Sequence, residues 1–332
     1  MSIARGGGAR RVAAGVGAVL IGFSSPEAAA QVDVTTPRLR SAVLERDAVA
    51  AKEEDGEGES LRLGEEPASN DGPSADDLLF LPKGDVFRPL LADPRQVRSY
   101  ASLHRLQASF GDFWVGTAGF GETFGIVGQR DAENNGWQVS IAGAVSSFFN
   151  FDGFDNDLIN TDFVIGIPVT WRAQPFSLRA NLYHQSSHIS DEFYRFEAFG
   201  PTDAIPTQKL SFEAIDVVLG YEPVERARVY AGANRIFSAD NAVRRWSYRM
   251  GGDWESPVLF GRTRAVAGVD IRWWAETGYQ LERSLKLGLQ FGGSTGVSRT
   301  SLLLEYFRGP YHHGFFYVHK VETLGLGLLF QF

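Results

Sequence analysis

Two residues whose side chains can perform acyl transfer lie two positions apart in the strand-like range Phe176–Ile189. His184 and Ser186 project to the same face of an extended chain, with backbones about 6.6 Å apart. An imidazole can bridge that gap to a hydroxyl, which makes His184 a candidate general base and Ser186 a candidate nucleophile. The spacing predicts a serine hydrolase dyad carried by a single strand.

A serine nucleophile also needs a third group that orients its base. The next strand-like range places Ser211 and Glu213 on the same face as an aliphatic run that includes Ile215. If Ile215 lies at the depth of Leu182 on the preceding strand, Glu213 lies beside His184. Glu213 is therefore the expected orienting acid.

Other residues near the dyad keep alternatives open. His188 shares the face of the dyad and can assist it or join a metal site, and two acids just beyond the strand are rival orienting groups, namely Asp191 and Glu192. His312 and His313 are adjacent in a later loop, where solvated side chains are the simpler interpretation. The sequence has no phosphate loop, metalloprotease helix motif or dinucleotide fingerprint. We expect no metal and no cofactor.

The strand that carries the dyad has two faces of different character. One face begins with the aliphatic residues Leu178, Ala180 and Leu182. The opposite face is polar throughout, comprising Arg179, Asn181, Tyr183, Gln185 and Ser187. In a membrane barrel the apolar face of a strand meets lipid and the polar face lines the lumen. The pattern favours a barrel strand over a strand of a soluble sandwich.

The N-terminal region predicts export. Three arginines precede the apolar run Val12–Phe23, and Ala28–Ala30 offers a small-residue cleavage site. These are the features of a secretory signal peptide, which we place at residues 1–30. No later run of about 18 apolar residues exists, so any membrane span must be made of strands.

The acidity of the chain is confined to the segment that follows. Residues 31–80 contain 13 acidic and 5 basic residues, which accounts for the formal charge of −8 of the whole chain. Few aromatic residues and a run of Glu, Asp and Gly predict a disordered linker over residues 31–79. The remainder is close to neutral, so nucleic acid is not an expected partner. No cysteine is present, which excludes thiolate catalysis and a disulfide scaffold.

From residue 98 onward the sequence alternates in segments of about ten to fifteen residues, the length that a tilted barrel strand requires. The segments predict an all-β fold, an antiparallel transmembrane β-barrel of about 12 strands over residues 98–332. Residues 80–97 are expected to form an ordered lead-in or periplasmic plug. The expected strands are Arg98–Phe110, Gly116–Gln129, Trp137–Phe149, Asn160–Trp171, Phe176–Ile189, Thr207–Tyr221, Arg226–Phe237, Val243–Phe260, Thr263–Ala275, Leu281–Phe291, Val297–Phe307 and Phe315–Phe332.

Strand direction follows from bacterial barrels, whose C-terminus we take to lie on the periplasmic side and whose external loops are the longer connections. With twelve strands, the short connection 222–225 is periplasmic and the long connection 190–206 is external. This registration places His184 and Ser186 near the external end of an upward strand, at the outer-leaflet interface.

Charged residues on the inward strand faces are expected to line the lumen. They are Arg179, Arg228, Arg264, Asp270, Arg272 and Glu305. Mixed charge favours an interior filled by paired long side chains over an open pore.

The final amphipathic strand ends at Phe332 and resembles the C-terminal assembly signal of outer-membrane barrel proteins. The resemblance implies the barrel assembly machinery as a partner, in addition to outer-membrane lipid. The implied location is the bacterial outer membrane, after removal of the signal peptide.

Two further stretches resemble known bacterial proteins. The runs Phe80–Arg95 and Tyr183–His188 resemble an uncharacterised exported family, domain of unknown function 1207, which implies an outer-membrane barrel without an assigned activity. The element from His184 to Ser186 resembles the His-x-Ser element of outer-membrane phospholipase A and of lipid A deacylase, which implies hydrolysis of a membrane lipid. The chain departs from the phospholipase pattern at Ala198, where that family carries its orienting Asn.

Three functions are consistent with these observations. The first is a structural or accessory outer-membrane barrel, the second a lipid-acting serine hydrolase with a lipid-facing dyad, and the third a narrow channel. If the protein is an enzyme, we expect an ester hydrolase that acts on membrane lipid.

Overall fold

The computed structural model describes residues 77–109, 111–152, 156–190, 193, 210–239, 246–275, 277–292 and 298–331. The predicted signal peptide and nearly all of the predicted acidic linker lie outside these residues, as does Phe332. The described residues all belong to one folded unit, residues 67–332.

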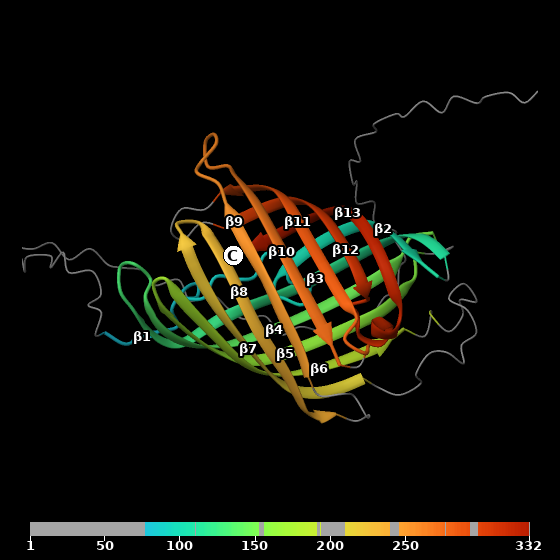
Figure 1. Ribbon diagram of the computed structural model, residues 1–332, viewed down its shortest axis with the longest axis horizontal. Helices are drawn as coiled ribbons and strands as arrows, with labels where there is room; N and C mark the ends of the chain where they lie inside the picture. Colours follow the sequence, from blue (N-terminus) through green and yellow to red (C-terminus); the bar gives the residue numbers. More distant parts are fainter. Residues whose placement is uncertain are drawn as a thin grey trace, which may run out of the picture. The chain divides into compact units, whose positions relative to one another are not determined.

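Twelve antiparallel strands close into a barrel because the last strand, β13, pairs with the first strand of the wall, β2 (Figure 1). Each other wall strand pairs with its neighbours in sequence, and the two-residue strand β1 adds to one edge of β3. The strands are β1 Leu79–Phe80, β2 Ser99–Ala108, β3 Gly111–Arg130, β4 Gly136–Asn150, β5 Leu158–Ala173, β6 Phe176–Ile189, β7 Leu210–Val224, β8 Ala227–Ala239, β9 Trp246–Glu255, β10 Arg264–Trp274, β11 Leu281–Gly292, β12 Arg299–Pro310 and β13 Lys320–Gln331.

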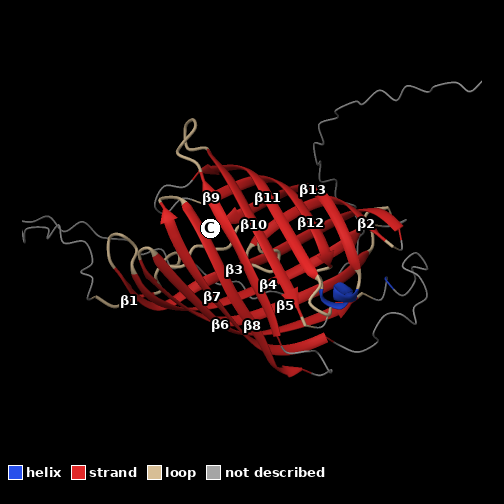
Figure 2. Cartoon of the chain, viewed as in Figure 1, coloured by secondary structure: helices blue, strands red, loops and turns tan. Residues whose placement is uncertain are grey.

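The wall carries its apolar side chains outward. Along β7, Ile215, Val217 and Leu219 are between 38% and 52% exposed, whereas Asp216 and Val218 between them are buried. Exposed large apolar groups and buried charges reverse the usual pattern of a soluble protein and suit a barrel whose outside meets lipid. Figure 2 shows that strands make up most of the described chain. No helix among the described residues has the length and apolarity needed to cross a membrane.

The predicted fold class is confirmed, and each of the twelve predicted ranges overlaps one wall strand. The predicted end of the strand at Phe260 is wrong, because β9 ends at Glu255. Pro257 has no N–H to donate to a ladder. The neighbouring Ser256 hydroxyl accepts a hydrogen bond from the Ala265 N–H (2.9 Å) and turns the chain into the connection to β10.

The two ends of the barrel differ in their connections. At one end β5 and β6 are joined through residues 174–175, β7 and β8 through residues 225–226, and the longest connection is 256–263. At the other end β6 is followed by residues 190–209 and β12 by residues 311–319. Bacterial barrels have short periplasmic turns and long external loops. The C-terminal half of β6 therefore lies toward the external end.

Before it enters the wall, the chain passes through the lumen. The short strand β1 pairs with β3, and the first wall strand, β2, begins at Ser99. Residues 82–98, which come before the wall, are called the lead-in segment. They run along the inside of the barrel, where Leu90 and Ala92 are fully buried. Gly268 of β10 permits this close approach, because a Cβ there would lie 3.3 Å from the Cβ of Ala92.

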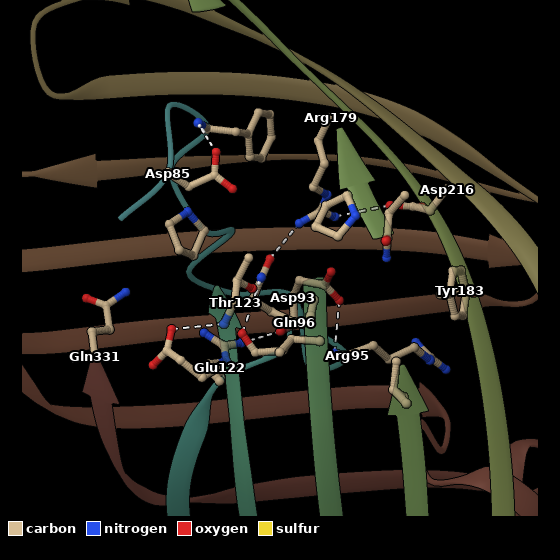
Figure 3. Close-up of a pocket in the computed structure, with 18 of the residues that line it drawn as sticks. Asp85, Asp93, Arg95, Gln96, Glu122, Thr123, Arg179, Tyr183, Asp216 and Gln331 are labelled. Atoms are coloured by element: carbon tan, nitrogen blue, oxygen red, sulfur yellow. Dashed lines mark hydrogen bonds and ion pairs between the residues drawn. The ribbon is translucent and has the colours of Figure 1, made fainter. Parts of the chain in front are cut away.

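Charged side chains of the wall hold the lead-in segment (Figure 3). Asp93 accepts hydrogen bonds from Arg249 (2.5 Å) and Arg272 (3.0 Å), and the Arg95 guanidinium makes two hydrogen bonds to Glu282 (2.7 and 3.1 Å). Burial alone raises the pKa of Asp93, but the guanidinium groups of Arg249 and Arg272 outweigh it and hold that pKa well below its usual range. A cavity of about 270 Å³ remains between the lead-in segment and the wall.

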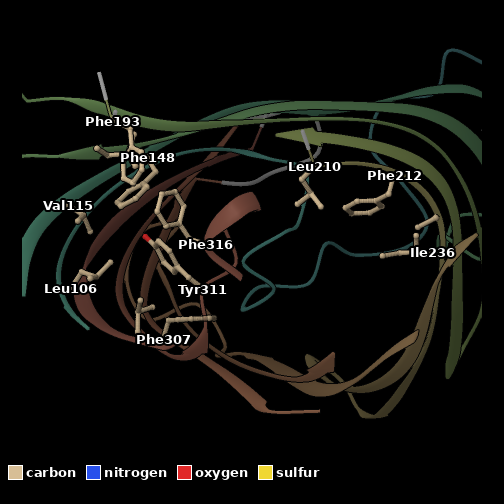
Figure 4. Close-up of a cluster of buried hydrophobic side chains, with 13 residues drawn as sticks. Leu106, Val115, Phe148, Phe193, Leu210, Phe212, Ile236, Phe307, Tyr311 and Phe316 are labelled. Carbon is tan, nitrogen blue, oxygen red and sulfur yellow. The ribbon is translucent and has the colours of Figure 1, made fainter. Parts of the chain in front are cut away.

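The external part of the lumen holds a hydrophobic cluster, whose side chains project inward from the wall and from the loops (Figure 4). The ring of Phe316 lies edge-on to Phe148 (5.7 Å between centroids) and to Phe193 (5.5 Å). These three rings come from three different parts of the chain, so they fasten the connection after β12 to the opposite wall.

That connection contains a short 3-10 helix, η4 (Gly314–Val318). Its Gly314 N–H donates to a carboxylate oxygen of Asp162 on β5 (3.2 Å), and the Ser187 hydroxyl of β6 donates to the same carboxylate. The predicted start of the last strand at Phe315 is therefore wrong, because this segment turns into the barrel mouth and β13 begins only at Lys320.

Candidate functional site

The dyad residues lie on the outward face of β6, toward its external end. The side chain of His184 is 40% exposed, and Ser186 is half-buried. Ser187, the next residue, is buried and turned to the lumen, so the alternation continues through the polar end of the strand. Leu182 is 50% exposed on the same face, which places the dyad directly above the lipid-facing apolar band.

The adjacent strand β7 contributes the acid. The register pairs Leu182 with Ile215 and His184 with Glu213, which is the alignment expected from the apolar bands of the two strands. The Nδ1 atom of His184 lies 3.1 Å from Oε1 of Glu213, whose side chain is 42% exposed. Because the carboxylate engages Nδ1, Nε2 is the ring nitrogen left to exchange a proton with a substrate or a nucleophile.

Ser186 stands two residues from His184 and opposite Ser211 of β7. Within the described part of the chain, no hydrogen bond joins Ser186 to His184. Both side chains project outward from backbone positions about 6.6 Å apart. Catalytic hydrogen bonds are often open without substrate and tighten in the Michaelis complex. The strand pair thus presents an oriented imidazole and a hydroxyl on one surface.

The rival residues have different surroundings. His188 is exposed, and its ring packs edge-on against Phe163 of β5 with centroids 5.5 Å apart. Asp191 and Glu192 lie outside the described residues. Glu213 is therefore the candidate acid whose contact with the imidazole is described.

His312 and His313 are not the solvated pair expected from the sequence. His313 is 1% exposed inside the barrel mouth, where its Nδ1 lies 3.4 Å from a carboxylate oxygen of Asp162. The two imidazole rings lie 4.4 Å apart, and His313 also stacks on Phe148 (5.6 Å). Over the described ranges, no group of three or more His, Asp or Glu residues is arranged to hold a metal ion.

The residues expected to line the lumen occupy inward strand positions, and each has a polar partner. The pairs are Arg179 with Asp216, Arg228 with Asp253, Arg264 with Glu255, Asp270 with Tyr230, Arg272 with Asp93, and Glu305 with both Lys286 and His104. Charges of both signs therefore neutralise one another inside the barrel, as expected for buried ionic groups.

Sequence reasoning missed the centre of this network. Asp216 accepts hydrogen bonds from Arg179 (3.1 Å) and Arg249 (2.9 Å), and Arg249 also reaches Asp93. The available signal was Asp93 itself, an acid in the apolar run Leu90 to Pro94 that must find cations if the run is buried. Its partners lie on strands β9 and β10, far away in the sequence.

A closed ring of twelve antiparallel strands, apolar outside and ionic inside, defines the protein as an outer-membrane type β-barrel. The chain belongs to the family described as "Protein of unknown function (DUF1207)", whose sequence profile matches residues 52–332. A comparison with curated proteins gives no match.

Several solved barrels are similar in fold. Outer membrane phospholipase A from Escherichia coli is 11% identical, with a TM-score of 0.47, and the similarity covers 71% of this chain and 92% of that chain. The KdgM porin is 8% identical, with a TM-score of 0.36, over 70% of this chain and 99% of that chain. The beta domain of the Bordetella autotransporter Brka is 13% identical, with a TM-score of 0.36, over 71% of this chain and 99% of that chain.

Proposed function

We propose that this barrel is a serine hydrolase that cleaves ester bonds of outer-membrane lipids. Ser186 is the nucleophile, His184 the general base and Glu213 the group that orients the base. The observation that carries the proposal is the His184–Glu213 hydrogen bond of 3.1 Å on the lipid-facing surface, with a serine on the same face.

The surroundings of the three residues suit a lipid substrate. Leu182 and Ile215, paired in register just below His184 and Glu213, continue the apolar outer surface. An acyl chain held against this surface brings its ester to the level of the polar groups, because the ester lies at the boundary between the hydrocarbon and the headgroups. The substrate therefore reaches the site from the bilayer and does not enter the lumen.

The proposed reaction uses these three side chains, the lipid ester and one water molecule. The Ser186 oxygen attacks the carbonyl carbon of the ester while Nε2 of His184 takes the hydroxyl proton. The tetrahedral intermediate collapses, and the departing alkoxide receives that proton. Water then attacks the acyl-serine ester with the same base and releases the fatty acid. Glu213 holds Nδ1–H throughout and stabilises the imidazolium.

Release of fatty acid from phosphatidylglycerol and from lipid A in mixed micelles tests the proposal. We expect Ser186→Ala and His184→Ala each to lower the turnover by at least about 10³-fold, because nucleophile and base act as one unit. A fluorophosphonate probe should label the full-length protein, and Ser186→Ala should abolish the labelling.

Ser211→Ala is the matched control, since it removes an outward hydroxyl opposite Ser186 without touching the dyad. This variant should keep its activity and its probe labelling. Barrel folding is verified by heat-modifiable migration in gels. Hydrolysis by a folded Ser186→Ala variant at the wild-type rate contradicts the proposal, and so does a folded wild-type protein that releases no fatty acid.

A structural or accessory barrel is the second candidate, and the ionic lumen favours it. Arg249 and Glu282 of the wall hold the lead-in segment inside the barrel through Asp93 and Arg95, as expected for a segment whose role is to close and brace the barrel. The same contacts give no support to the narrow channel. Three negative results with folded protein would support the structural role: no lipid hydrolysis, no labelling by the probe, and no ion conductance in a planar bilayer.

A further inference from the structure

A second polar cluster interrupts the lipid-facing surface, on strands β11, β12 and β13. The register places Arg283, Arg308 and Glu322 in one row across these strands. Lys320, at the start of β13, lies one step further toward the external end. All four side chains occupy the outward positions of their strands.

Below this row, the same three strands form a leucine-rich surface. Leu287, Leu304 and Leu326 align in one row and are between 49% and 57% exposed. The next row is made of Leu289, Leu302 and Leu328. The surface is an apolar wall three strands wide, and the basic cluster lies at its external edge.

The positive charge of the cluster is only partly compensated. Arg283 and Arg308 stand directly opposite each other, an arrangement in which like charges repel. Glu322 lies 3.6 Å from Arg308 and accepts a hydrogen bond from the Tyr306 hydroxyl (3.0 Å). Across the described ranges, no carboxylate is within ion-pair distance of Arg283 or Lys320. Three cations and one carboxylate leave two positive charges unmatched.

A groove of about 500 Å³ opens beside the cluster, lined by residues that include Arg283, Arg308, Lys320 and Glu322. A phosphomonoester carries a charge of about −1.5 to −2 at neutral pH, which matches the unmatched charge better than the single charge of a phosphodiester. The groove is larger than one phosphate group and leaves room for a sugar. Arginine pairs also suit phosphate oxygens, to which each guanidinium donates two hydrogen bonds.

We propose that strands β11 to β13 bind an outer-leaflet glycolipid that carries a phosphomonoester. The phosphate lies between Arg283, Arg308 and Lys320, and the acyl chains run along the leucine rows beneath them. The bound phosphate also relieves the repulsion between the two arginines. This site is separate from the dyad on β6 and β7, and it stands whether or not the barrel hydrolyses lipid.

Native mass spectrometry of the delipidated full-length protein in detergent tests the site with three probes: diphosphoryl lipid A, enzymatically dephosphorylated lipid A and phosphatidylglycerol. We expect diphosphoryl lipid A to bind at least about tenfold more tightly than the other two. The double variant Arg283→Gln/Arg308→Gln should lose this preference, and the Arg283→Lys/Arg308→Lys variant should keep most of it because it keeps the charge.

Arg235→Gln is the matched control, because Arg235 is an exposed outward arginine on another strand, where its guanidinium lies 5.4 Å from the Trp246 ring. It should bind diphosphoryl lipid A like the wild type. Equal affinity for all three lipids overturns the proposal. A folded Arg283→Gln/Arg308→Gln variant that binds diphosphoryl lipid A as tightly as the wild type overturns it as well.

Discussion

Charged groups inside the barrel and charged groups on its outer face follow different rules. Inside, Asp93 is 2% exposed and contacts two arginines, and Glu305 is 8% exposed and contacts Lys286 and His104. Outside, His184 and Glu213 are about 40% exposed and pair with each other, and Ser238 of β8 is a further hydrogen-bond partner of Glu213. The interior charges are shielded from water by their protein partners, whereas the outward pair stays accessible to whatever surrounds the barrel.

The difference has a physical cause. A charge buried in the lumen loses its water, so folding is favourable only if cations and anions are brought together there. A charge at the membrane interface keeps access to water and headgroups and costs little by itself. Substitutions inside should therefore change the stability of the barrel, and substitutions outside should change activity or lipid binding.

The largest expected effect on stability comes from Asp93→Asn. This change leaves Arg249 and Arg272 without their shared carboxylate, and breaking a buried ionic group typically costs about 3–5 kcal/mol. Urea unfolding in lipid vesicles, followed by tryptophan fluorescence and heat-modifiable migration, measures the loss. An unfolding midpoint equal to that of the wild type would mean that the lead-in segment contributes nothing to the barrel.

Acid should remove the stability that the Asp93 carboxylate gives the barrel. The pKa of Asp93 is held below its usual range by Arg249 and Arg272 against the opposing effect of burial. A carboxyl with a depressed folded pKa stabilises the fold fully above its unfolded pKa of about 3.9, and this stability is lost as the pH falls through the folded pKa. The wild type should therefore lose stability relative to Asp93→Asn below about pH 4, and the difference should be constant between about pH 5 and 7. A difference that shrinks already at pH 6 would contradict this assignment.

Asp85→Asn, in the same segment, is the matched comparison. Burial raises the pKa of Asp85, although the Thr170 hydroxyl donates to it (2.6 Å). A raised folded pKa means that the stability linked to this group is present below its unfolded pKa and lost as the pH rises through the folded pKa. At pH 7 the amide should therefore leave stability unchanged or raise it by up to about 1 kcal/mol, because its oxygen still accepts from Thr170. A loss of stability as large as that of Asp93→Asn would mean that the ionised Asp85 stabilises the barrel as much as Asp93 does.

The strands and the outer site were predictable because both depend on local alternation. Period-two patterns identified all twelve wall strands, and aligning the aliphatic runs around Leu182 and Ile215 was enough to place Glu213 beside His184. Alternation alone did not set the end of β9 or the start of β13. The first follows from Pro257 and the Ser256 contact with Ala265, and the second from the contact of η4 with Asp162 in the barrel mouth. Whether the lead-in segment acts as a plug remains a proposal.

The lumenal network was less predictable, because its pairs join strands that are distant in the sequence. Alternation shows that Arg249 and Arg272 face inward, but their common partner Asp93 comes from a segment with no periodic pattern. The depth of that segment inside the barrel depends on close approaches such as the one at Gly268. Such contacts become visible only when the ring of strands is closed.

The smallest expected effect on stability concerns the outward pair His184 and Glu213. It also tests most directly whether outward charges differ from lumenal ones. Glu213→Gln removes the carboxylate from His184 but leaves a well-exposed position that water and headgroups can solvate. The urea midpoint should stay at the wild-type value, while the rate of lipid hydrolysis falls at least about tenfold because the imidazole loses the group that orients it. A lowered midpoint with unchanged hydrolysis would mean that Glu213 stabilises the barrel, as the lumenal charges do, and has no part in catalysis.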